Sequence, residues 1–508
     1  MLAEYHHGTC APCPAPFSLA AHVLGGADAQ PDKIALAVLR LSGAERWSYA
    51  RLKSAILGTG TGLLRQGMQP GDRVLMRLGN TVEFPIAYLG AIAVGLVPIP
   101  TSSQLTAPEV AGIIDTTQPA LILRDGAIAC PETDIPVLGV ADLRAMRDLP
   151  EADWQLGDPE RLAYIIYTSG TSGIPRAVCH AHRAIWARRM MFDGWYGLRP
   201  EDRLCHAGAF NWTFTLGTGL MDPWTMGATA LIPAPEVTPE QIPLLLKRHD
   251  ATLFAAGPGV YRKILKHHAK MSLPHLRHGL AAGEKLSETL RRQWQEATDT
   301  AIYEAYGLSE CSTFISGSPD HPATPGTLGR PQDGRRVAII GPDGPVETGA
   351  EGTIAVHNSD PGLMRGYLGA PEATAAKFAG DWFLTGDQGM MDAQGEITYL
   401  GRADDMMNAG GFRVSPIEVE QALLPHPGIT EVAVTDIEVK EDARVIMAFY
   451  TGPESLDPAS LDAFARERLA GYKAPRDYIH VDALPTGANG KLLRRALRPI
   501  QKDRHGQA

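Results

Sequence analysis

The sequence predicts an α/β protein with a large N-terminal domain of layered α/β subdomains plus a β-rich subdomain, and a small mobile α+β C-terminal domain. Short apolar, β-branched runs alternate with amphipathic stretches up to about residue 335, which is typical of largely parallel sheets covered by helices. Beyond it, Gly, Asp and Pro punctuate shorter strands, as in antiparallel hairpins. After Asp405, helix and strand patterns return on a smaller scale. The predicted domains are 1–403, with its β-rich part at about 335–403, and 404–508.

Each predicted element follows from the length and period of its apolar pattern. Continuous apolar runs of strand length predict buried strands at 73–78, 120–125, 164–169, 252–257 and 278–284. Apolar residues at helical spacing predict helices at 49–66 and 240–249. Further strands are expected within 337–356 and at 395–402, 431–439 and 445–450, with helices at 416–424 and 461–469.

Composition and charge limit the classes of function. The chain has 508 residues, 44% of them apolar and 20% charged, and a formal net charge of −10. This charge argues against a general nucleic-acid or anionic-membrane binder, although a local basic patch can still hold a phosphate. The apolar run at 84–100 is short for a membrane span and is broken by prolines, so it predicts a buried helix leading into a buried strand. No signal-peptide pattern is visible, and none is expected.

The six cysteines are few and scattered, which does not suit a disulfide framework and makes a reducing cytoplasm the expected location. Cys10 and Cys13 form a C-x-x-C pair beside His6 and His7. A zinc site is one interpretation of this pair, but no second pair completes a set of four ligands. We therefore expect no zinc.

The strongest local pattern is a loop rich in hydroxyls and glycines after the apolar run at 162–167. The loop contains Thr168, Ser169, Gly170, Thr171, Ser172 and Gly173. Glycines let backbone N–H groups approach an anion and the hydroxyls add donors, so phosphate is the expected ligand. The loop lacks the G-x-x-x-x-G-K-[ST] pattern of a P-loop. A polar hairpin loop is the alternative interpretation.

This loop resembles that of the acyl-adenylate-forming superfamily, which includes acyl-CoA synthetases, adenylation domains of peptide synthetases, and luciferases. The family pattern usually ends in Pro-Lys, whereas this chain has Pro175-Arg176. Arginine keeps the positive charge and can bind phosphate through two donors, but it is not equivalent to lysine. Further family motifs follow in the family's order over nearly the whole chain, so the resemblance does not rest on the loop alone.

Residues 306–310, YGLSE, resemble the family motif Y-G-x-T-E. The resemblance implies that Tyr306 stacks on adenine, with Gly307 in the same nucleotide site. It also implies that Ser309 contacts phosphate and that Glu310 helps to bind Mg²⁺, which commonly keeps waters and phosphates as its other ligands. Taken without the other motifs, the segment could equally be a helix start with a surface acid.

Two more segments complete the implied ATP/AMP site in the first domain. Asp387, in a Thr-Gly-Asp sequence, matches the family aspartate that accepts hydrogen bonds from the ribose hydroxyls. A turn aspartate is the alternative. Gly283 and Glu284 lie in a segment that resembles the family's S-x-G-E motif, and the resemblance places them in the nucleotide site.

Residues 401–420 resemble the family's hinge motif more specifically than any other segment. By this match Arg402 reaches the ribose or α-phosphate, and Arg413 also belongs to the nucleotide site. Asp404 is the implied hinge at which the small domain turns. Gly410 and Gly411 lie on the implied path of the pantetheine arm of coenzyme A, where a side chain would block it. The alternative for the two glycines is a flexible turn.

Near the end of the chain, residues 484–494 resemble the motif P-x-x-x-x-G-K-[ILV]-x-[RK]. The resemblance makes Lys491 the lysine that bridges the carboxylate, the α-phosphate and the ribose. Together with Ser309 and Glu310 it forms the implied catalytic set, because an ammonium there stabilises the charge that develops as pyrophosphate leaves. Without the motif, Lys491 would be one of several basic residues on a solvated helix face.

The residues of the acyl pocket are the hardest to predict from the sequence. Residues that the resemblance places around it are Phe210, Trp212, Phe214, Gly257, Pro258 and Ala282. The three aromatic residues could form a flat apolar wall or belong to the ordinary core, and His206 is equally ambiguous. Among family members, the segments at 80–92 and 413–420 look most like the benzoate–CoA ligase group. This analogy favours an aromatic or medium-sized apolar acid, although analogy does not fix a substrate.

The expected activity is therefore that of an acid–CoA ligase. A carboxylic acid, ATP and CoA would give acyl-CoA, AMP and pyrophosphate through an acyl-adenylate, with Mg²⁺ as the metal. An adenylating enzyme that loads a carrier protein or an amine is the nearest alternative, followed by a luciferase-like oxidase and a non-catalytic nucleotide sensor. We expect small-molecule partners and no nucleic acid or membrane span. The sequence leaves monomer and homodimer open.

Overall fold

The computed structural model describes residues 1–168, 176–403, 405, 407–409, 412–440, 443–469, 471, 473–486 and 492–499. The chain divides into two compact units. The larger unit comprises Tyr5–Val337 and Val356–Phe383, and the smaller one comprises Met1–Glu4, Ala338–Ala355 and Leu384–Ala508. This division groups much of the β-rich region with the C-terminal residues, so it differs from the boundary predicted at residues 403 and 404.

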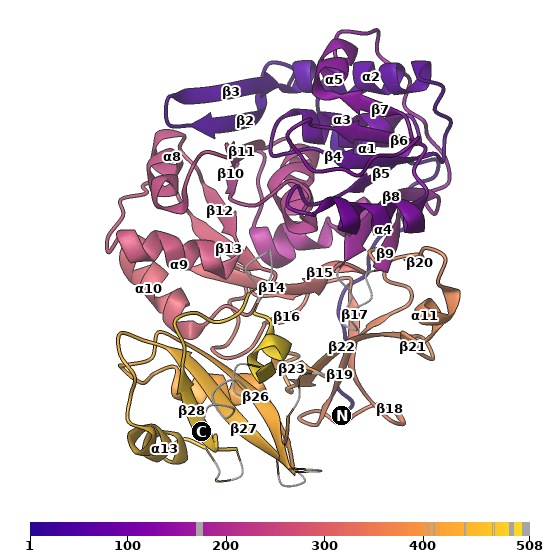
Figure 1. The fold of residues 1–508 in the computed structure, drawn as a ribbon. Helices are drawn as coiled ribbons and strands as arrows, with labels where there is room; N and C mark the ends of the chain where they lie inside the picture. The colour runs from indigo at the N-terminus through magenta and orange to yellow at the C-terminus, as the bar shows by residue number, and fades with distance from the viewer. Residues whose placement is uncertain are drawn as a thin grey trace. The chain divides into compact units, whose positions relative to one another are not determined.

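A nine-stranded sheet is the main element of the larger unit (Figure 1). Its order is β16-β15-β14-β13-β12-β10-β11-β2-β3. The strands are β2 (Ile34–Arg40), β3 (Gly43–Ser48), β10 (Arg203–His206), β11 (Thr229–Pro233), β12 (Leu253–Ala256), β13 (His278–Ala282), β14 (Ile302–Leu308), β15 (Ser312–Ser316) and β16 (Arg330–Pro331). All neighbours from β14 to β2 pair in parallel. The predicted α/β class is confirmed, and the strands predicted at 252–257 and 278–284 are β12 and β13.

Helices α8 (Ile242–Arg248), α9 (Pro258–His267) and α10 (Glu288–Thr298) lie beside this sheet (Figure 1). Their buried aromatic residues explain why they pack there. Tyr261 of α9 and Trp294 of α10 meet edge to face at 4.7 Å between ring centroids, and both contact Phe254 of β12. Such aromatic clusters bury a large apolar area and fix the helices against the strands.

A four-stranded parallel sheet, β5-β4-β6-β7, lies near the N-terminus of the larger unit. Its strands are β4 (Arg73–Arg77), β5 (Val97–Pro100), β6 (Leu121–Arg124) and β7 (Val137–Gly139). The apolar run at 84–100 forms α3 (Glu83–Ala93) followed by β5, and every residue of both elements is buried. The predicted helix at 49–66 is α2 (Tyr49–Arg65), whose N-cap Ser48 accepts a hydrogen bond from the Arg51 N–H.

A third sheet of the larger unit pairs β8 (Leu162–Thr168), β9 (Arg176–Ala181) and β20 (Gly366–Tyr367) in antiparallel fashion. The remaining helices of this unit are α1 (Leu19–Val23), α4 (Ala107–Thr117), α5 (Val140–Met146), α6 (Ala184–Ala187), α7 (Asp222–Met226), α11 (Pro371–Ala375), the π-helices η1 (Phe192–Tyr196) and η2 (Thr215–Met221), and the 3₁₀ turn η3 (Pro239–Gln241). None of the helices within the described ranges has the length and apolar content needed to cross a membrane.

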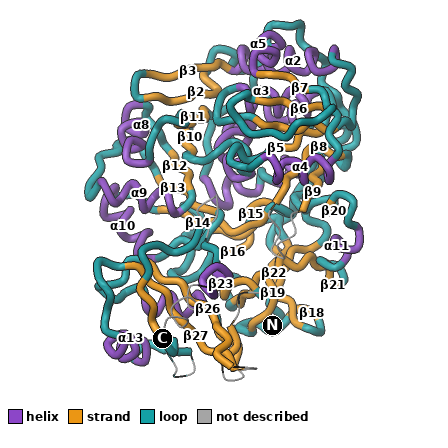
Figure 2. The backbone as a smooth tube through the Cα atoms, viewed as in Figure 1, coloured by secondary structure: helices purple, strands orange, loops and turns teal. Residues whose placement is uncertain are grey.

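Strands and loops dominate the β-rich region, as Figure 2 shows around β19 and β22. A seven-stranded sheet runs β1-β17-β19-β22-β21, with β18 on β17 and β23 on β22. Its strands are β1 (Glu4–His6), β17 (Arg336–Gly341), β18 (Gly344–Pro345), β19 (Glu351–His357), β21 (Phe378–Ala379), β22 (Trp382–Met391) and β23 (Ile397–Arg402). The antiparallel hairpins predicted from the glycine and proline pattern are present.

The C-terminal residues of the smaller unit form an α+β arrangement. Its described elements are β24 (Met407–Ala409), β25 (Phe412–Val414), α12 (Pro416–Leu423), β26 (Glu431–Lys440), β27 (Ala443–Thr451), α13 (Pro458–Arg466), β28 (Asp477–His480) and η4 (Arg494–Ala496). Glu420 of α12 accepts hydrogen bonds from Arg494 and, at 2.8 Å, from the Val434 N–H. This partly buried carboxylate joins α12, β26 and η4, so the last glutamate of the hinge motif has a structural role.

Candidate active site

Four of the predicted site residues of the larger unit collect at one edge of the nine-stranded sheet. Trp212, Gly257, Gly283 and Ser309 follow the carboxyl ends of β10, β12, β13 and β14 in turn. These four strands are parallel to one another, so their carboxyl ends meet at the same edge. Open α/β sheets bind ligands at this edge.

The turn after β14 carries Ser309 and Glu310, and its shape depends on Gly307. A Cβ atom at Gly307 would lie 2.0 Å from the Ser312 backbone oxygen, so a larger residue would displace the turn. The pairing of β14 with β15 shifts register between Tyr306 and Gly307. Ser312 closes the turn with a φ of 66°, a region that residues other than glycine rarely adopt.

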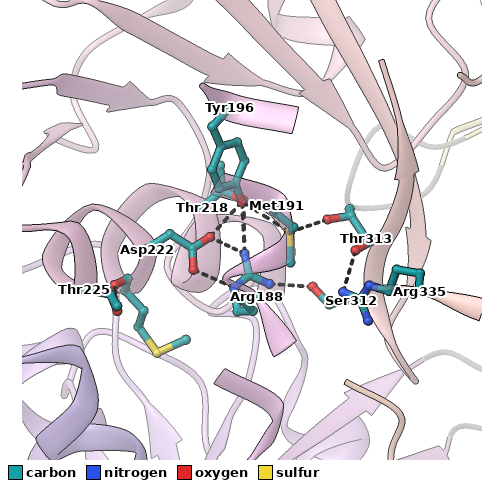
Figure 3. Close-up of polar contacts among 10 residues, drawn as sticks. Arg188, Met191, Tyr196, Thr218, Asp222, Thr225, Ser312, Thr313 and Arg335 are labelled. Atoms are coloured by element: carbon teal, nitrogen blue, oxygen red, sulfur yellow. Dashed lines mark hydrogen bonds and ion pairs between the residues drawn. The ribbon is translucent and has the colours of Figure 1, made fainter. Parts of the chain in front are cut away.

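Buried side chains from distant segments hold this turn in its conformation. The His180 Nε2 atom lies 2.7 Å from the Ser309 carbonyl oxygen. Arg188 donates to the Ser312 hydroxyl, and Arg335 donates to the Thr313 carbonyl at 3.2 Å; Figure 3 shows both arginines. The sequence analysis missed these three supporting residues, because no local pattern distinguishes a buried arginine from one on a solvated helix face.

The Glu310 carboxylate is positioned by Tyr367 of β20. The Tyr367 hydroxyl donates to Glu310 Oε1 at 2.7 Å, and the Met364 N–H donates to the Glu310 carbonyl at 2.7 Å. The Arg176 guanidinium lies over the Tyr367 ring at 5.7 Å from its centroid. Two residues predicted from separate motifs, Arg176 and Glu310, are thus brought together by a tyrosine that the sequence analysis missed.

This donor set fits a magnesium-bound phosphate chain. Glu310 supplies one half-buried carboxylate, and Mg²⁺ is usually held by one or two protein carboxylates together with phosphates and water. Arg176 supplies a cation with a planar fork of donors that suits phosphate oxygens.

Trp212, which is predicted for the acyl pocket, packs beside two glycines and Phe214. A Cβ atom on Gly283, which has a φ of +95°, would lie 2.6 Å from Trp212, and one on Gly257 would lie 3.6 Å from it. The Phe214 ring meets Trp212 edge to face at 5.1 Å. The two glycines therefore leave room for the indole, which packs against them and against the buried Phe214 ring.

The other residues predicted for the pocket are placed differently. Ala282 packs in the same buried cluster as Phe214, and Pro258 opens α9 directly after Gly257. Phe210 does not join this group, because it is fully buried in another cluster and stacks on Phe84 at 5.9 Å. For Phe210 the structure favours the core interpretation over the pocket wall.

Glu284 and Tyr306, at the same edge of the nine-stranded sheet, both contact other side chains or backbone groups. Glu284 accepts a hydrogen bond from the Gly259 N–H at 3.2 Å and lies 3.7 Å from the Arg262 guanidinium. Its carboxylate therefore sits at the N-terminus of α9, where negative charge is favourable. The Tyr306 ring meets Phe314 edge to face at 5.4 Å.

In the smaller unit, Asp387 and Arg402 are direct cross-strand partners on β22 and β23. The Arg402 Nε atom lies 3.2 Å from Asp387 Oδ1. Thr385, the threonine of the Thr-Gly-Asp sequence, has a structural role. Its hydroxyl donates to the Ile354 carbonyl and accepts from the Asp387 N–H. The structure thus joins two residues that the sequence predicted for the ribose and phosphate.

Several predicted residues lie outside the described part of the chain. They are Ser169, Gly170, Thr171, Ser172, Gly173, Asp404, Gly410, Gly411 and Lys491, together with the side chains of Thr168 and Arg413. Their roles stay predictions.

Comparison with known proteins decides the family. A family described as "AMP-binding enzyme" matches residues 25–368, which is more than half of the chain. The chain belongs to the AMP-binding enzyme family. A second match, described as "AMP-binding enzyme C-terminal domain", covers residues 418–491.

This AMP-binding enzyme resembles acid–CoA ligases along nearly its whole length. It is 29% identical to the 3-hydroxybenzoate–CoA ligase of Aromatoleum sp. (strain CIB), over 91% of this chain and 93% of that one. It is 31% identical to the benzoate–CoA ligase of Thauera aromatica, over 85% and 86% of the two chains. Its class is that of the AMP-forming acid–CoA ligases.

Solved structures are also similar to this chain along nearly its whole length. The ATP-bound MatB from Rhodopseudomonas palustris matches with a TM-score of 0.87 and 27% identity, over 96% of this chain and 99% of that one. The benzoate–CoA ligase from Burkholderia xenovorans LB400 matches with a TM-score of 0.82 and 25% identity, over 95% and 100% of the two chains.

The contact of Tyr367 with Glu310 makes a testable prediction. Tyr367→Phe keeps the ring but removes the hydroxyl, and a hydrogen bond to a charged group is worth about 1.5–3 kcal/mol. We expect the KM for MgATP to rise about tenfold in this AMP-binding enzyme, measured by pyrophosphate release across a Mg²⁺ titration. Tyr303→Phe, which removes a hydroxyl elsewhere in the larger unit, is the control and should leave the KM unchanged. An unaltered Mg²⁺ dependence in Tyr367→Phe would contradict the positioning role.

Proposed function

We propose that this AMP-binding enzyme activates an aromatic carboxylic acid with MgATP and transfers the acyl group to coenzyme A. The observation that carries the proposal is the pair of aromatic rings, Trp212 and Phe214, beside Gly257 and Gly283 at the same sheet edge as Ser309. Aromatic side chains bind planar rings through stacked and edge-to-face contacts. The activities of the benzoate–CoA and 3-hydroxybenzoate–CoA ligases support the same class of acid.

In the first half-reaction, a carboxylate oxygen of the acid bonds to the α-phosphorus of ATP, and the bond to the β-phosphate breaks to release pyrophosphate. Glu310 would hold the magnesium ion that neutralises the phosphates, and Arg176 would bind a phosphate oxygen. Asp387 would accept hydrogen bonds from the ribose. Lys491 would stabilise the negative charge on the in-line oxygens, where electrostatic stabilisation contributes most to phosphoryl chemistry.

In the second half-reaction, the sulfur of coenzyme A attacks the acyl carbonyl, the thiol proton is lost, and AMP leaves with its phosphate oxygen. The mixed anhydride is already activated, so the proposal needs no protein nucleophile. The C-terminal residues would turn about Asp404 between the two steps, a hinge-type change. Gly410 and Gly411 would then border the pantetheine arm without obstructing it.

The test is pyrophosphate release from MgATP with a panel of acids, each with and without CoA. The panel runs from acetate through octanoate to benzoate and the hydroxybenzoates. We expect thioester formation that requires both CoA and an aromatic acid. Turnover only with short or long aliphatic acids would contradict the substrate class, and adenylation without any thioester product would favour loading of a carrier protein or an amine.

We also propose a cytoplasmic location, on the basis of the few scattered cysteines, and a homodimer as the assembly to be tested. Light scattering of the purified protein would measure the mass. A mass equal to one chain would contradict the dimer.

A further inference from the structure

A small cavity lies directly behind the turn that carries Ser309. Its volume is about 30 Å³, which is enough for one or two water-sized groups. The wall comes from α3, β8, β9, α6 and η2, and most of it is apolar or aromatic. Leu308 and Ser309 line the side toward the turn, and Thr213 and Leu216 belong to the segment predicted for the acyl pocket.

Two buried polar atoms in the cavity wall have no hydrogen-bond partner among the residues that the structure describes. They are the hydroxyl oxygen of Tyr88 and the Nδ1 atom of His180. Tyr88 is 1% exposed and His180 is 3% exposed. Buried polar groups are nearly always paired, so two unpaired ones at a single cavity indicate a ligand or water that completes them.

The tautomer of His180 follows from its other nitrogen. The Nε2 atom lies 2.7 Å from the Ser309 carbonyl oxygen, and since a carbonyl only accepts, Nε2 carries the hydrogen. Burial lowers the pKa of His180 to about 4, so the ring is neutral near pH 7. The Nδ1 atom therefore presents a lone pair to the cavity and requires a donor.

Tyr88 supplies the complementary group. Burial raises the pKa of its hydroxyl well above the ordinary value, so the hydroxyl stays protonated and can donate. The charged group in the wall, the Arg188 guanidinium, is already neutralised, because its Nε and Nη2 atoms donate to both oxygens of Asp222 at 2.8 and 2.7 Å. The cavity thus suits an uncharged group that both donates and accepts, rather than a second carboxylate.

We infer that the acid substrate carries a hydroxyl group that enters this cavity, where it donates to His180 Nδ1 and accepts from the Tyr88 hydroxyl. This inference rests on the proposed function and refines it from aromatic acids to hydroxylated aromatic acids. The cavity borders Ser309, so it lies close to the reacting carboxyl end of the acid as well as to the acyl segment. A methoxy or chloro substituent lacks the hydrogen that Nδ1 requires.

The experiment compares kcat/KM for benzoate and for its hydroxy and methoxy derivatives, in the wild type and in Tyr88→Phe. A site built to hydrogen-bond a substrate hydroxyl discriminates strongly against analogues that lack it. We expect the wild type to prefer one hydroxybenzoate over benzoate and its methoxy ether by more than about 100-fold. Tyr88→Phe should reduce that ratio by about tenfold while leaving the benzoate value within about twofold.

Tyr164→Phe is the matched control, because Tyr164 lines the same cavity and its ring lies 6.1 Å from that of Tyr88. An equal fall in both variants would overturn the assignment to Tyr88. Turnover of benzoates without any preference for a hydroxyl would overturn the inference and leave the proposed function standing, with water as the occupant of the cavity. Absence of turnover with every aromatic acid would overturn both. Unchanged thermal unfolding of Tyr88→Phe would show that the variant is folded.

Discussion

Replacement of Asp222 by alanine is expected to lower the free energy of unfolding by about 3–5 kcal/mol, because it leaves the Arg188 guanidinium buried without its counter-ion. Arg188 and Asp222 are 7% and 0% exposed and are joined by two hydrogen bonds (Figure 3). Burial lowers the pKa of Arg188, but the Asp222 carboxylate outweighs this effect and raises that pKa above its ordinary value. The arginine is therefore held as a cation that cannot escape by losing its proton.

Replacement of Asp222 should impair the active site as well as lower the stability. Arg188 donates to the Ser312 hydroxyl, and Ser312 closes the turn that presents Ser309 and Glu310. An arginine released from Asp222 would no longer hold that turn, so we expect kcat for adenylation to fall by about tenfold or more, since small misplacements of catalytic groups are costly.

Urea denaturation followed by tryptophan fluorescence measures the stability effect. The double variant Arg188→Met/Asp222→Leu should recover much of the lost stability, because replacement of a whole buried ion pair by apolar residues is often neutral. Glu236→Ala is the matched control: its exposed pair with Arg40 should contribute less than about 1 kcal/mol. A loss below about 1 kcal/mol in Asp222→Ala would mean that water reaches the guanidinium and that the pair is not buried in solution.

The fold could be predicted from the sequence wherever one local rule dominates. The helix expected at 49–66 appears as Tyr49–Arg65 because an N-cap serine and an unbroken apolar stripe agree. The run at 84–100 became a buried helix and strand because Pro85 falls in the first turn of the helix, and Pro98 and Pro100 lie in a strand at the edge of its sheet. In each case local preference and burial favoured the same structure.

Other elements depend on backbone details that a periodic pattern does not contain. The strand expected at 278–284 ends at Ala282, because Gly283 turns into the left-handed region with a φ of +95°. The helix expected from 240 to 249 begins as a 3₁₀ turn at Pro239–Gln241 and becomes α-helical only at Ile242. The π-helix at Thr215–Met221 was not predicted, because its spacing of apolar residues does not differ visibly from that of an α-helix.

The candidate site shows the same division. Residues inside motifs, such as Glu310, Asp387 and Arg402, could be named because their spacing along the chain is informative. The residues that hold them in place could not, because Tyr367 and His180 reach the turn from 57 and 129 positions away in sequence. Phe210 and Trp212 have the same local pattern, and only the packing against Phe84 identifies Phe210 as a core residue, whereas Trp212 stays a prediction for the pocket.

Replacement of Lys491 by alanine is expected to reduce the rate of adenylation by about 100- to 1000-fold, the usual cost of removing one group that stabilises transition-state charge. The proposed function has this ammonium act only while pyrophosphate leaves. Its removal should therefore lower kcat for adenylation far more than it changes the KM for ATP. Thioester formation from supplied acyl-adenylate and CoA needs no such cation, and we expect it to fall by less than about threefold.

The two half-reactions can be measured separately, by pyrophosphate exchange for the first and by thioester formation from synthetic acyl-adenylate for the second. Gly411→Leu is the reciprocal variant, because a side chain on the proposed pantetheine path should block the second reaction and spare the first. This opposite pattern distinguishes two separate roles, one in each half-reaction, from a general loss of folding, which would lower both rates together. An equal fall of both rates in Lys491→Ala would remove the lysine from the adenylation step, and CoA transfer that survives Gly411→Leu would place the pantetheine arm elsewhere.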